Sequence, residues 1–380
     1  MFSMSCPNNL PKTSWIILFL AIYSYCIFVL CTFYYSEKTP EYKSHPPKPN
    51  VKMSWNCSIP PSKTVLPDHP RAAAQDQLKL SNQSSVTVIL IWTWPLGHTF
   101  PLSQCPPLVD SSHCFFTLNR SMYSVAKAVV ISHRDVWSHS QLPQGPRPPN
   151  QYWIWFSLEP PQYLKNLTIM DNFINMTMSF RADSDIFTPY GWLEKSDEKE
   201  NFTIPQKTRL VAWVASNWKA KQRVEYYTEL KKHIKVDVYG KGHLDLPRNQ
   251  TLQTLSTYKF YLAFENSVHE DYITEKFWKN SFLAGTVPVV MGPPRKNYER
   301  FAPPDSFIHV DDFSSPQELA SYLLSLEKDD QKYQQYFNWR SSYKPVKNEK
   351  SWVTEYCKVC KALKEAPSYR TIPSIAEWFI

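Results

Sequence analysis

The sequence predicts an α/β protein built on parallel sheets. Residues 258–292 alternate between an apolar run, a polar loop, a helical pattern and a second apolar run, which is typical of a strand–loop–helix–strand unit. Apolar runs at 86–92, 128–132 and 152–158 have the length and composition of buried parallel strands. Further runs follow at 209–215 and 236–240. Residues 86–380 are too many for one small domain, so we expect two.

The N-terminal region predicts a membrane anchor. Residues 15–35 contain no charged side chain across 21 positions. A helix of that length spans roughly 31 Å at about 1.5 Å per residue, which matches the hydrocarbon core of a bilayer. A cleaved signal peptide has a shorter apolar core and a small-residue cleavage site, so we interpret the span as a retained signal anchor. Residues 1–14 would form a cytoplasmic tail. Residues 36–85, rich in Pro, Lys and Ser, would form a flexible stem.

Seven Asn-X-Ser/Thr sequences all follow the predicted span. Such sequences are glycan acceptors only in a lumenal or extracellular domain. Their one-sided distribution therefore favours a type II topology with a lumenal body. The acceptor asparagines are Asn56, Asn82, Asn119, Asn166, Asn175, Asn201 and Asn249.

The charge and the glycine content exclude several classes of protein. A net charge of +8 and a pI near 8.9 could indicate a nucleic-acid partner, but no RNA- or DNA-binding motif accompanies them. Gly240-Lys241-Gly242 lacks a third glycine, and the chain has seven glycines in all, which disfavours dinucleotide oxidoreduction and P-loop chemistry. A basic body better suits an anionic nucleotide sugar or acidic glycans.

Two strand ends carry candidate functional residues. Glu159 follows the run at 152–158, and the proline after it holds Glu159 extended at the strand end. By position alone, this carboxylate would more simply cap a neighbouring helix. Glu265 and Asn266 follow the run that ends at 264, and Lys276 lies near the start of the next helix, where an anion would bind favourably. An ordinary helix N-terminus explains this second pattern equally well.

Longer motifs carry a specific resemblance. Three successive stretches resemble the donor-binding segment of the α-1,3/4-fucosyltransferases, with the vertebrate Lewis-type enzymes most similar. They are FENS, then YITEK, then VPVVMGPPRKNYERFAPPDSFIHVDDF. The resemblance extends from about Val86 to the C-terminus. It implies a GT-B architecture, in which two Rossmann-like domains face a cleft. Residues 86–205 would bind the acceptor, residues 206–350 would bind GDP-fucose, and residues 351–380 would form a helix packing back on the acceptor domain.

The resemblance also implies roles for individual residues. Glu159 would be the catalytic base of an inverting transfer, taking the proton of the attacking hydroxyl. Arg223 and Lys276 would neutralise charge on the leaving GDP, and Glu275 would bind sugar hydroxyls. Considered alone, Arg223 would fit a solvated helix face. The full predicted donor set is Ser216, Asn217, Arg223, Asn266, Tyr272, Glu275 and Lys276.

The acceptor prediction rests on Ser132-His133-Arg134-Asp135, which resembles the HHRD or HHWD motif of the family. Ser132 departs from the first His of that motif. Arg at the third position goes with type 2 chains, so His133, Arg134 and Asp135 predict fucosylation of GlcNAc O3 in Galβ1,4GlcNAc, giving Lewis x-type products. The alternatives are additional α-1,4 activity on type 1 chains and a catalytically silent glycan-binding paralogue. A lumenal sulfotransferase is disfavoured because no phosphate-binding loop motif is present.

Asp183 and Asp185 form a DxD pattern that binds a divalent metal in many other glycosyltransferases. The resembled family retains this segment without needing that metal. We therefore predict no obligatory cofactor, with Mn²⁺ or Mg²⁺ able to stimulate. The predicted partners are GDP-fucose, N-acetyllactosamine-type acceptors and the Golgi membrane, and not nucleic acid.

Four of the cysteines fall in the body. Cys357 and Cys360 form a CxxC, but no second CxxC accompanies it as a zinc site would require. Four cysteines allow three connectivities, and the resemblance implies Cys105–Cys357 and Cys114–Cys360. Cys57, in the predicted stem, suggests either intermolecular pairing or a free thiol.

Overall fold

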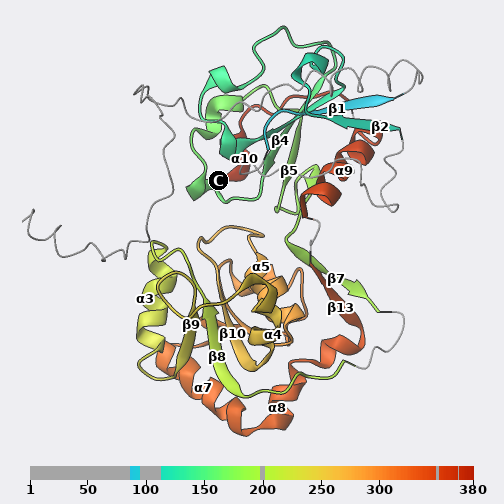
Figure 1. The fold of residues 1–380 in the computed structure, drawn as a ribbon. Helices are drawn as coiled ribbons and strands as arrows, with labels where there is room; N and C mark the ends of the chain where they lie inside the picture. Colours follow the sequence, from blue (N-terminus) through green and yellow to red (C-terminus); the bar gives the residue numbers. More distant parts are fainter. Residues whose placement is uncertain (1–85, 95–112, 197–201, 348–350, 367) are drawn as a thin grey trace, which may run out of the picture. The chain divides into compact units, whose positions relative to one another are not determined.

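Two parallel sheets organise the protein (Figure 1). The computed structural model describes residues 86–94, 113–196, 202–347, 351–366 and 368–380. The first sheet has the strand order β2-β1-β3-β4-β5-β6 and the second β12-β11-β10-β8-β9. All pairs of neighbouring strands described in the two sheets are parallel, which confirms the α/β class. An antiparallel pair, β7 (Gly191–Lys195) and β13 (Tyr343–Lys347), completes the described strands.

The first sheet is buried on both faces. Its strands are β1 (Thr87–Ile91), β2 (Cys114–Thr117), β3 (Ala128–Ser132), β4 (Tyr152–Ser157), β5 (Met176–Ser179) and β6 (Ile186–Phe187). Because side chains alternate along a strand, Val88 and Leu90 belong to one core cluster and Ile89 and Ile91 to another. The continuous apolar runs in the sequence reflect this two-sided burial.

The two helices at the C-terminal end of the chain cover this first sheet. Helix α9 (Ser351–Lys364) adds Tyr356, Val359 and Cys360 to the cluster that contains Ile89. Helix α10 (Ile375–Phe379) adds its first and last residues to the cluster that contains Val88. Both helices are red in Figure 1 and lie beside the strands of the first sheet.

The crossovers of the first sheet differ from the Rossmann-like expectation. In the described residues between β2 and β6 they are loops with 3₁₀ helices and contain no α-helix. These helices are η2 (Arg120–Met122), η3 (His133–Asp135), η4 (His139–Gln141), η5 (Pro161–Tyr163) and η6 (Leu167–Met170). Short apolar segments therefore cover one face of the sheet together with α10. In η6, for example, Leu167, Ile169 and Met170 are buried in the same cluster as α10.

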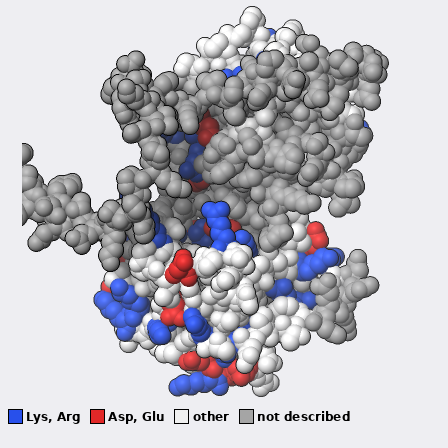
Figure 2. Space-filling model, viewed as in Figure 1, with Lys and Arg blue, Asp and Glu red and all other residues white. Residues whose placement is uncertain are grey.

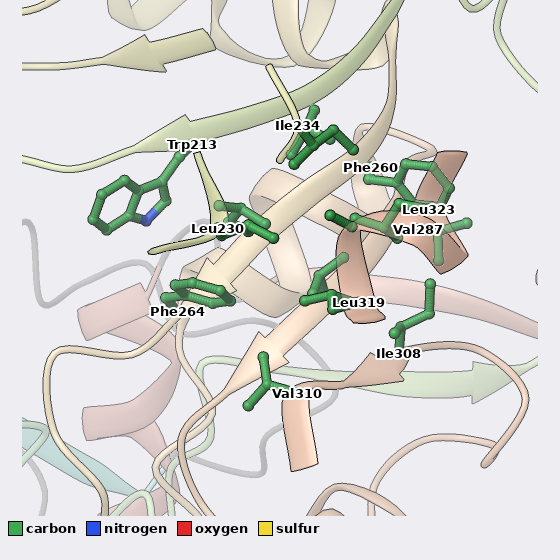
Figure 3. Close-up of a cluster of buried hydrophobic side chains, with 14 of the residues drawn as sticks. Trp213, Leu230, Ile234, Phe260, Phe264, Val287, Ile308, Val310, Leu319 and Leu323 are labelled. Carbon is green, nitrogen blue, oxygen red and sulfur yellow. The ribbon is translucent and has the colours of Figure 1, made fainter. Parts of the chain in front are cut away.

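The second sheet follows the predicted pattern more closely. Its strands are β8 (Arg209–Val214), β9 (Val236–Tyr239), β10 (Tyr258–Phe264), β11 (Val287–Met291) and β12 (Ile308–His309). One face packs against α3 (Lys221–Leu230), α7 (Pro316–Lys328) and α8 (Asp330–Gln335). Figure 3 shows this cluster, in which Leu230 of α3 and Leu319 and Leu323 of α7 surround the strand residues Phe260 and Phe264. Each buried Leu contributes about 1.5–3 kcal/mol through the apolar surface removed from water.

The opposite face of the second sheet packs against shorter helices, α4 (Thr251–Ser256), α5 (Glu275–Phe277), η8 (Trp278–Leu283) and α6 (Arg295–Tyr298). The helical pattern predicted within 258–292 is thus a short α-helix, α5, that continues as a π-helix, η8. Ser281 Oγ donates to the carbonyl oxygen of Lys276 at 2.8 Å, and Asn280 Nδ2 donates to the Tyr261 hydroxyl at 3.0 Å. The bond from Ser281 occupies a backbone carbonyl oxygen and so competes with the regular α-helical ladder, which accompanies its widening, whereas the bond from Asn280 ties the helix to β10.

On the face seen in Figure 2, Lys and Arg side chains are interspersed with Asp and Glu over the part that carries α3, α7 and α8. The net positive charge therefore forms no single-sign patch there. The predicted tail, membrane span and stem, at 1–14, 15–35 and 36–85, lie outside the described residues. Among the helices of the described ranges, none combines the length and the apolarity that crossing a bilayer requires.

Candidate functional site

The acceptor motif forms the turn that follows β3. Ser132 Oγ donates to Asp135 Oδ2 at 2.7 Å, which closes the turn. His133 is 1% exposed and uses both ring nitrogens: Trp155 Nε1 donates to Nδ1 at 2.8 Å, and Nε2 contacts the Lys165 carbonyl oxygen at 2.8 Å. Nε2 therefore carries the proton. Burial lowers the pKa of His133. The ring is a neutral structural element of the turn, so its influence on an acceptor would be indirect.

Arg134 contacts the predicted base. Its side chain is 41% exposed, and Nη1 donates to Oε1 of Glu159, whose side chain is 25% exposed. Glu159 follows β4, and its backbone N–H donates to Ser157 Oγ at 3.1 Å. The ends of the neighbouring parallel strands β3 and β4 thus bring the acceptor motif and the carboxylate together, which the sequence could not show.

A buried carboxylate organises the loop after β10. Glu265 is 4% exposed and accepts hydrogen bonds from the Thr274 backbone N–H at 2.8 Å and from the Thr274 hydroxyl at 2.9 Å. Lys276 Nζ lies 2.9 Å from Glu265 Oε2, 2.7 Å from Thr274 Oγ1 and 3.3 Å from Glu275 Oε1. The predicted phosphate-binding ammonium is therefore already neutralised by two carboxylates. Sequence reasoning noted Glu265 at the strand end and gave it no role.

The charges in this cluster influence one another. Burial raises the pKa of Glu265, against the attraction of Lys276. Desolvation lowers the pKa of Lys276, but the charges of Glu265 and Glu275 outweigh it and raise that pKa above its ordinary value. Desolvation likewise raises the pKa of Glu275, yet Lys276 brings it below its usual value. Glu275 is half exposed, so its carboxylate remains accessible to a sugar hydroxyl.

Arg223 holds two strand ends of the second sheet together. It is 3% exposed, and its guanidinium donates to the Phe264 carbonyl oxygen at 3.0 Å and to the Asn217 carbonyl oxygen at 2.7 Å. Nε is buried and has no hydrogen-bond partner among the described residues. Burial lowers the pKa of Arg223, and the nearby charge of Glu265 opposes this. A buried guanidinium with an unused donor N–H is suited to an anionic ligand.

Asn217 and Asn266 flank this arginine. Asn217 Nδ2 donates to the Tyr163 hydroxyl at 3.1 Å, and that hydroxyl donates to the Asn266 carbonyl oxygen at 3.3 Å. Oδ1 of Asn266 is buried without a hydrogen-bond partner among the described residues. Ser216 follows β8 and is exposed. It lies beside Gly240, where the Cβ of any other residue would come within 2.5 Å of the Ala215 carbonyl oxygen. Asn217 thus contacts Arg223 directly, and the Tyr163 hydroxyl links it to Asn266.

Two tyrosines, Tyr272 buried and Tyr190 partly buried, connect the predicted base with the donor residues. Tyr272, 3% exposed, packs its ring 5.1 Å from Phe180 and 6.2 Å from Tyr190. The Tyr190 hydroxyl donates to the carbonyl oxygen of Leu158, directly before Glu159, at 2.6 Å. Burial raises the pKa of both tyrosines, and the charges of Glu159, Glu265 and Glu275 raise each pKa further. The charges of carboxylates from both halves of the chain therefore raise the pKa of the same two tyrosines.

Both aspartates of the DxD pattern accept hydrogen bonds from arginine side chains. Asp183 accepts two hydrogen bonds from Arg181, at 2.8 and 2.7 Å. Asp185 accepts from Arg370 at 2.7 Å and from the Thr177 backbone N–H at 2.8 Å. In the described part of the chain, the one cluster with metal-ligand spacing is His113, Cys114 and Cys360, whose two sulfurs form a disulfide and supply no thiolate. Whether a divalent cation stimulates the protein stays a prediction.

The predicted Cys114–Cys360 disulfide is present and joins β2 to α9 across 246 residues. Cys357 is also disulfide-bonded. Its predicted partner, Cys105, lies outside the described residues, so that pairing stays a prediction. Cys57 lies outside them as well.

The glycan acceptors differ in accessibility. Asn166 and Asn249 are exposed, and Asn119 is partly exposed. Asn175 is 1% exposed, and its Nδ2 donates to the Arg370 carbonyl oxygen at 2.5 Å. A glycan on Asn175 would have to displace this contact, so Asn175 is the least accessible of the four described acceptors, and glycosylation of all seven stays a prediction. Asn56, Asn82 and Asn201 lie outside the described residues.

The comparisons with known proteins agree with this geometry. Residues 204–378 match "Glycosyltransferase family 10 (fucosyltransferase) C-term", and residues 84–191 match "Fucosyltransferase, N-terminal". The 3-galactosyl-N-acetylglucosaminide 4-alpha-L-fucosyltransferase FUT3 of Homo sapiens is 50% identical over 299 residues, 77% of this chain and 82% of the relative. The 4-galactosyl-N-acetylglucosaminide 3-alpha-L-fucosyltransferase FUT6 of Homo sapiens is 50% identical over 302 residues, 78% and 83% of the two chains.

A third relative, FUT3 of Bos taurus, is 46% identical over 361 residues, 93% of each chain. A crystal structure of an alpha1,3-fucosyltransferase has a similar fold, with a TM-score of 0.52 and 18% identity over 76% of this chain and 93% of the other.

Proposed function

This chain belongs to glycosyltransferase family 10, the fucosyltransferases, and on that premise we propose that it transfers L-fucose from GDP-fucose to O3 of GlcNAc in Galβ1,4GlcNAc. One set of contacts carries the proposal: the Tyr190 hydroxyl donates to the carbonyl oxygen of Leu158, directly before Glu159, and the Tyr190 ring lies 6.2 Å from the ring of Tyr272 in the YITEK segment. The strand end that carries the proposed base and the donor-binding segment are thus close enough to serve one reaction.

The proposed reaction is a single displacement with inversion. The Glu159 carboxylate removes the proton of the acceptor hydroxyl while that oxygen attacks the anomeric carbon of fucose. The bond from that carbon to the GDP oxygen breaks, and the bonding electrons leave with GDP. Arg223 and Lys276 then stabilise the charge that develops on the diphosphate. The unused Nε of Arg223 makes it the first candidate for this contact, because Lys276 is already balanced by Glu265 and Glu275.

The Arg134–Glu159 ion pair gives the acceptor motif a second role. In the structure the guanidinium of Arg134 contacts the carboxylate that has to accept a proton. An acceptor that hydrogen-bonds Arg134 would draw this guanidinium away from Glu159 and free an oxygen for the attacking hydroxyl. The relatives carry both 3- and 4-linkage names at the same identity, so overall similarity does not choose between the linkages. Arg134 favours type 2 acceptors.

Incubating the purified protein with GDP-fucose and paired type 2 and type 1 disaccharides tests the proposal. We expect transfer to Galβ1,4GlcNAc to exceed transfer to Galβ1,3GlcNAc. Glu159→Gln should retain GDP binding and lower turnover by about 10²- to 10⁴-fold, the usual contribution of a general base. Unchanged turnover would remove Glu159 from the mechanism. No transfer by the wild type at any pH would favour the glycan-binding alternative.

We further propose that the protein is held in the Golgi membrane by residues 15–35, with its body in the lumen. The 21 uncharged positions and the glycan acceptors that follow them support this topology. Treatment of sealed Golgi vesicles with protease should leave the body intact. Its digestion without detergent would show the opposite orientation.

A further inference from the structure

Tyr163 connects the segment that carries Glu159 to the donor residues. It is the last residue of η5, and its side chain is 38% exposed. Its hydroxyl oxygen accepts from Nδ2 of Asn217 at 3.1 Å, and its O–H donates to the carbonyl oxygen of Asn266 at 3.3 Å. One phenol therefore uses its donor and its acceptor capacity on two loops of the second sheet. A side chain this exposed does not hold its place through core packing.

The connection from Tyr163 back to Glu159 is short and stiff. Pro160 and Pro161 lie between them, and each proline ring fixes its own φ. The backbone N–H of Tyr163 donates to the Pro160 carbonyl oxygen at 3.0 Å, and that of Leu164 donates to the Pro161 carbonyl oxygen at 3.0 Å. A displacement of Tyr163 therefore also displaces Glu159, because the intervening backbone has few free torsions.

The other end of the connection is equally well held. The Asn217 carbonyl oxygen accepts from Arg223, which also donates to the Phe264 carbonyl oxygen two residues before Asn266. Tyr163 thus contacts the same two loops that Arg223 fastens from the interior. The phenol and the guanidinium together set the distance between the end of β4 and the ends of β8 and β10.

We propose that Tyr163 is a positioning residue that holds Glu159 in register with the bound donor. The proposal rests on the function given above, because it needs Glu159 to act on an acceptor beside the donor. The hydroxyl takes no part in bond making. Its loss leaves the carboxylate and the donor residues in place and widens the range of positions that the carboxylate occupies. Misplacement by about 1 Å can cost on the order of 10²-fold in rate.

The test compares Tyr163→Phe with a matched control. Tyr369 is 41% exposed, and its hydroxyl also donates to a backbone carbonyl oxygen, that of Gln151, at 3.2 Å. Both variants are made in the full chain, and their thermal unfolding confirms that they fold. We expect Tyr163→Phe to lower kcat about tenfold, with the Kd for GDP and the KM for GDP-fucose within about twofold of wild type. Tyr369→Phe should leave kcat unchanged.

A double variant separates positioning from a general structural effect. If Tyr163 acts through Glu159, adding Tyr163→Phe to Glu159→Gln should lower the residual rate by less than twofold. A further tenfold loss in the double variant overturns the proposal, as does a wild-type kcat in Tyr163→Phe or an equal loss in Tyr369→Phe. Failure of the wild type to transfer fucose would refute the proposed function instead, so the two failures are distinguishable.

Discussion

The buried pair between Glu265 and Lys276 gives the strongest single test of how the donor loop is built. The Glu265 side chain is fully buried and that of Lys276 is 12% exposed, with 2.9 Å between Oε2 and Nζ. Removing one member of a buried pair commonly costs about 3–5 kcal/mol, because the other charge is left uncompensated. Here Lys276 keeps Glu275 at 3.3 Å, so we expect about 2–3 kcal/mol for Glu265→Gln.

A double-mutant cycle isolates the pair. Glu265→Gln, Lys276→Met and the double variant should give a coupling energy of about 2–3 kcal/mol in denaturant unfolding. The exposed pair between Glu229, at the end of α3, and Lys232, just beyond it, is the matched control, with 2.7 Å between its atoms and side chains more than half exposed. Its coupling should be about 0.3–0.5 kcal/mol. A buried-pair coupling no larger than that of the control would refute the view that this ion pair supports the loop.

The same variants carry a pH dependence. Burial already raises the pKa of Glu265, and Lys276→Met removes the charge that opposes this rise. A carboxyl group with a raised folded-state pKa binds more protons in the folded state than in the unfolded state. The Lys276→Met variant should therefore lose stability as pH rises from about 4.3 through the folded-state pKa of Glu265, by up to about 1.4 kcal/mol per pH unit. The double variant should lack this additional slope in the free energy of unfolding.

Two other substitutions test further contacts. Arg223→Lys retains the charge but loses the planar donor set that reaches Phe264 and Asn217, so we expect the Kd for GDP to rise by about tenfold or more, measured by calorimetry. An unchanged affinity would remove Arg223 from the donor site. Replacing Cys114 and Cys360 together by Ser should lower the free energy of unfolding by about 2–5 kcal/mol, as expected for a link across 246 residues. Reductant, which also reduces the disulfide of Cys357, should lower the stability of the wild type by at least as much. A loss below about 1 kcal/mol in the double variant would show that packing and the Cys357 disulfide hold α9 without this link.

The strands that the sequence predicts well are those buried on both faces. The segment 128–132 matches β3 at both ends, because an uninterrupted apolar run suits only a central parallel strand. The four-residue strands β2 and β5 escape prediction, since CFFT is too short an apolar run and MTMS alternates between apolar and polar residues over only four positions.

The site shows the same division between local and long-range information. Glu159 and Lys276 are recognisable because each lies in a contiguous motif, Glu159 at the end of a strand and Lys276 in the first turn of a helix. The contacts between stretches are not recognisable. Glu265 pairs with Lys276 across a loop, Tyr190 hydrogen-bonds the residue before Glu159, and Tyr163 reaches a residue 103 positions away. These partners depend on how the sheets and loops meet, and a single sequence carries no pattern for such distances.

The covering of the first sheet by the last helices has a consequence for folding. Residues 209–347 are continuous in sequence and contain the strands and most of the helical residues of the second core. The first sheet lacks this independence, because Tyr356 and Val359 of α9 and Phe379 of α10 belong to its two clusters. During synthesis the second half can therefore bury its core before the first half does. The segment that presents Glu159 acquires its final support only when the end of the chain has packed, so the base is positioned last and the donor loops first.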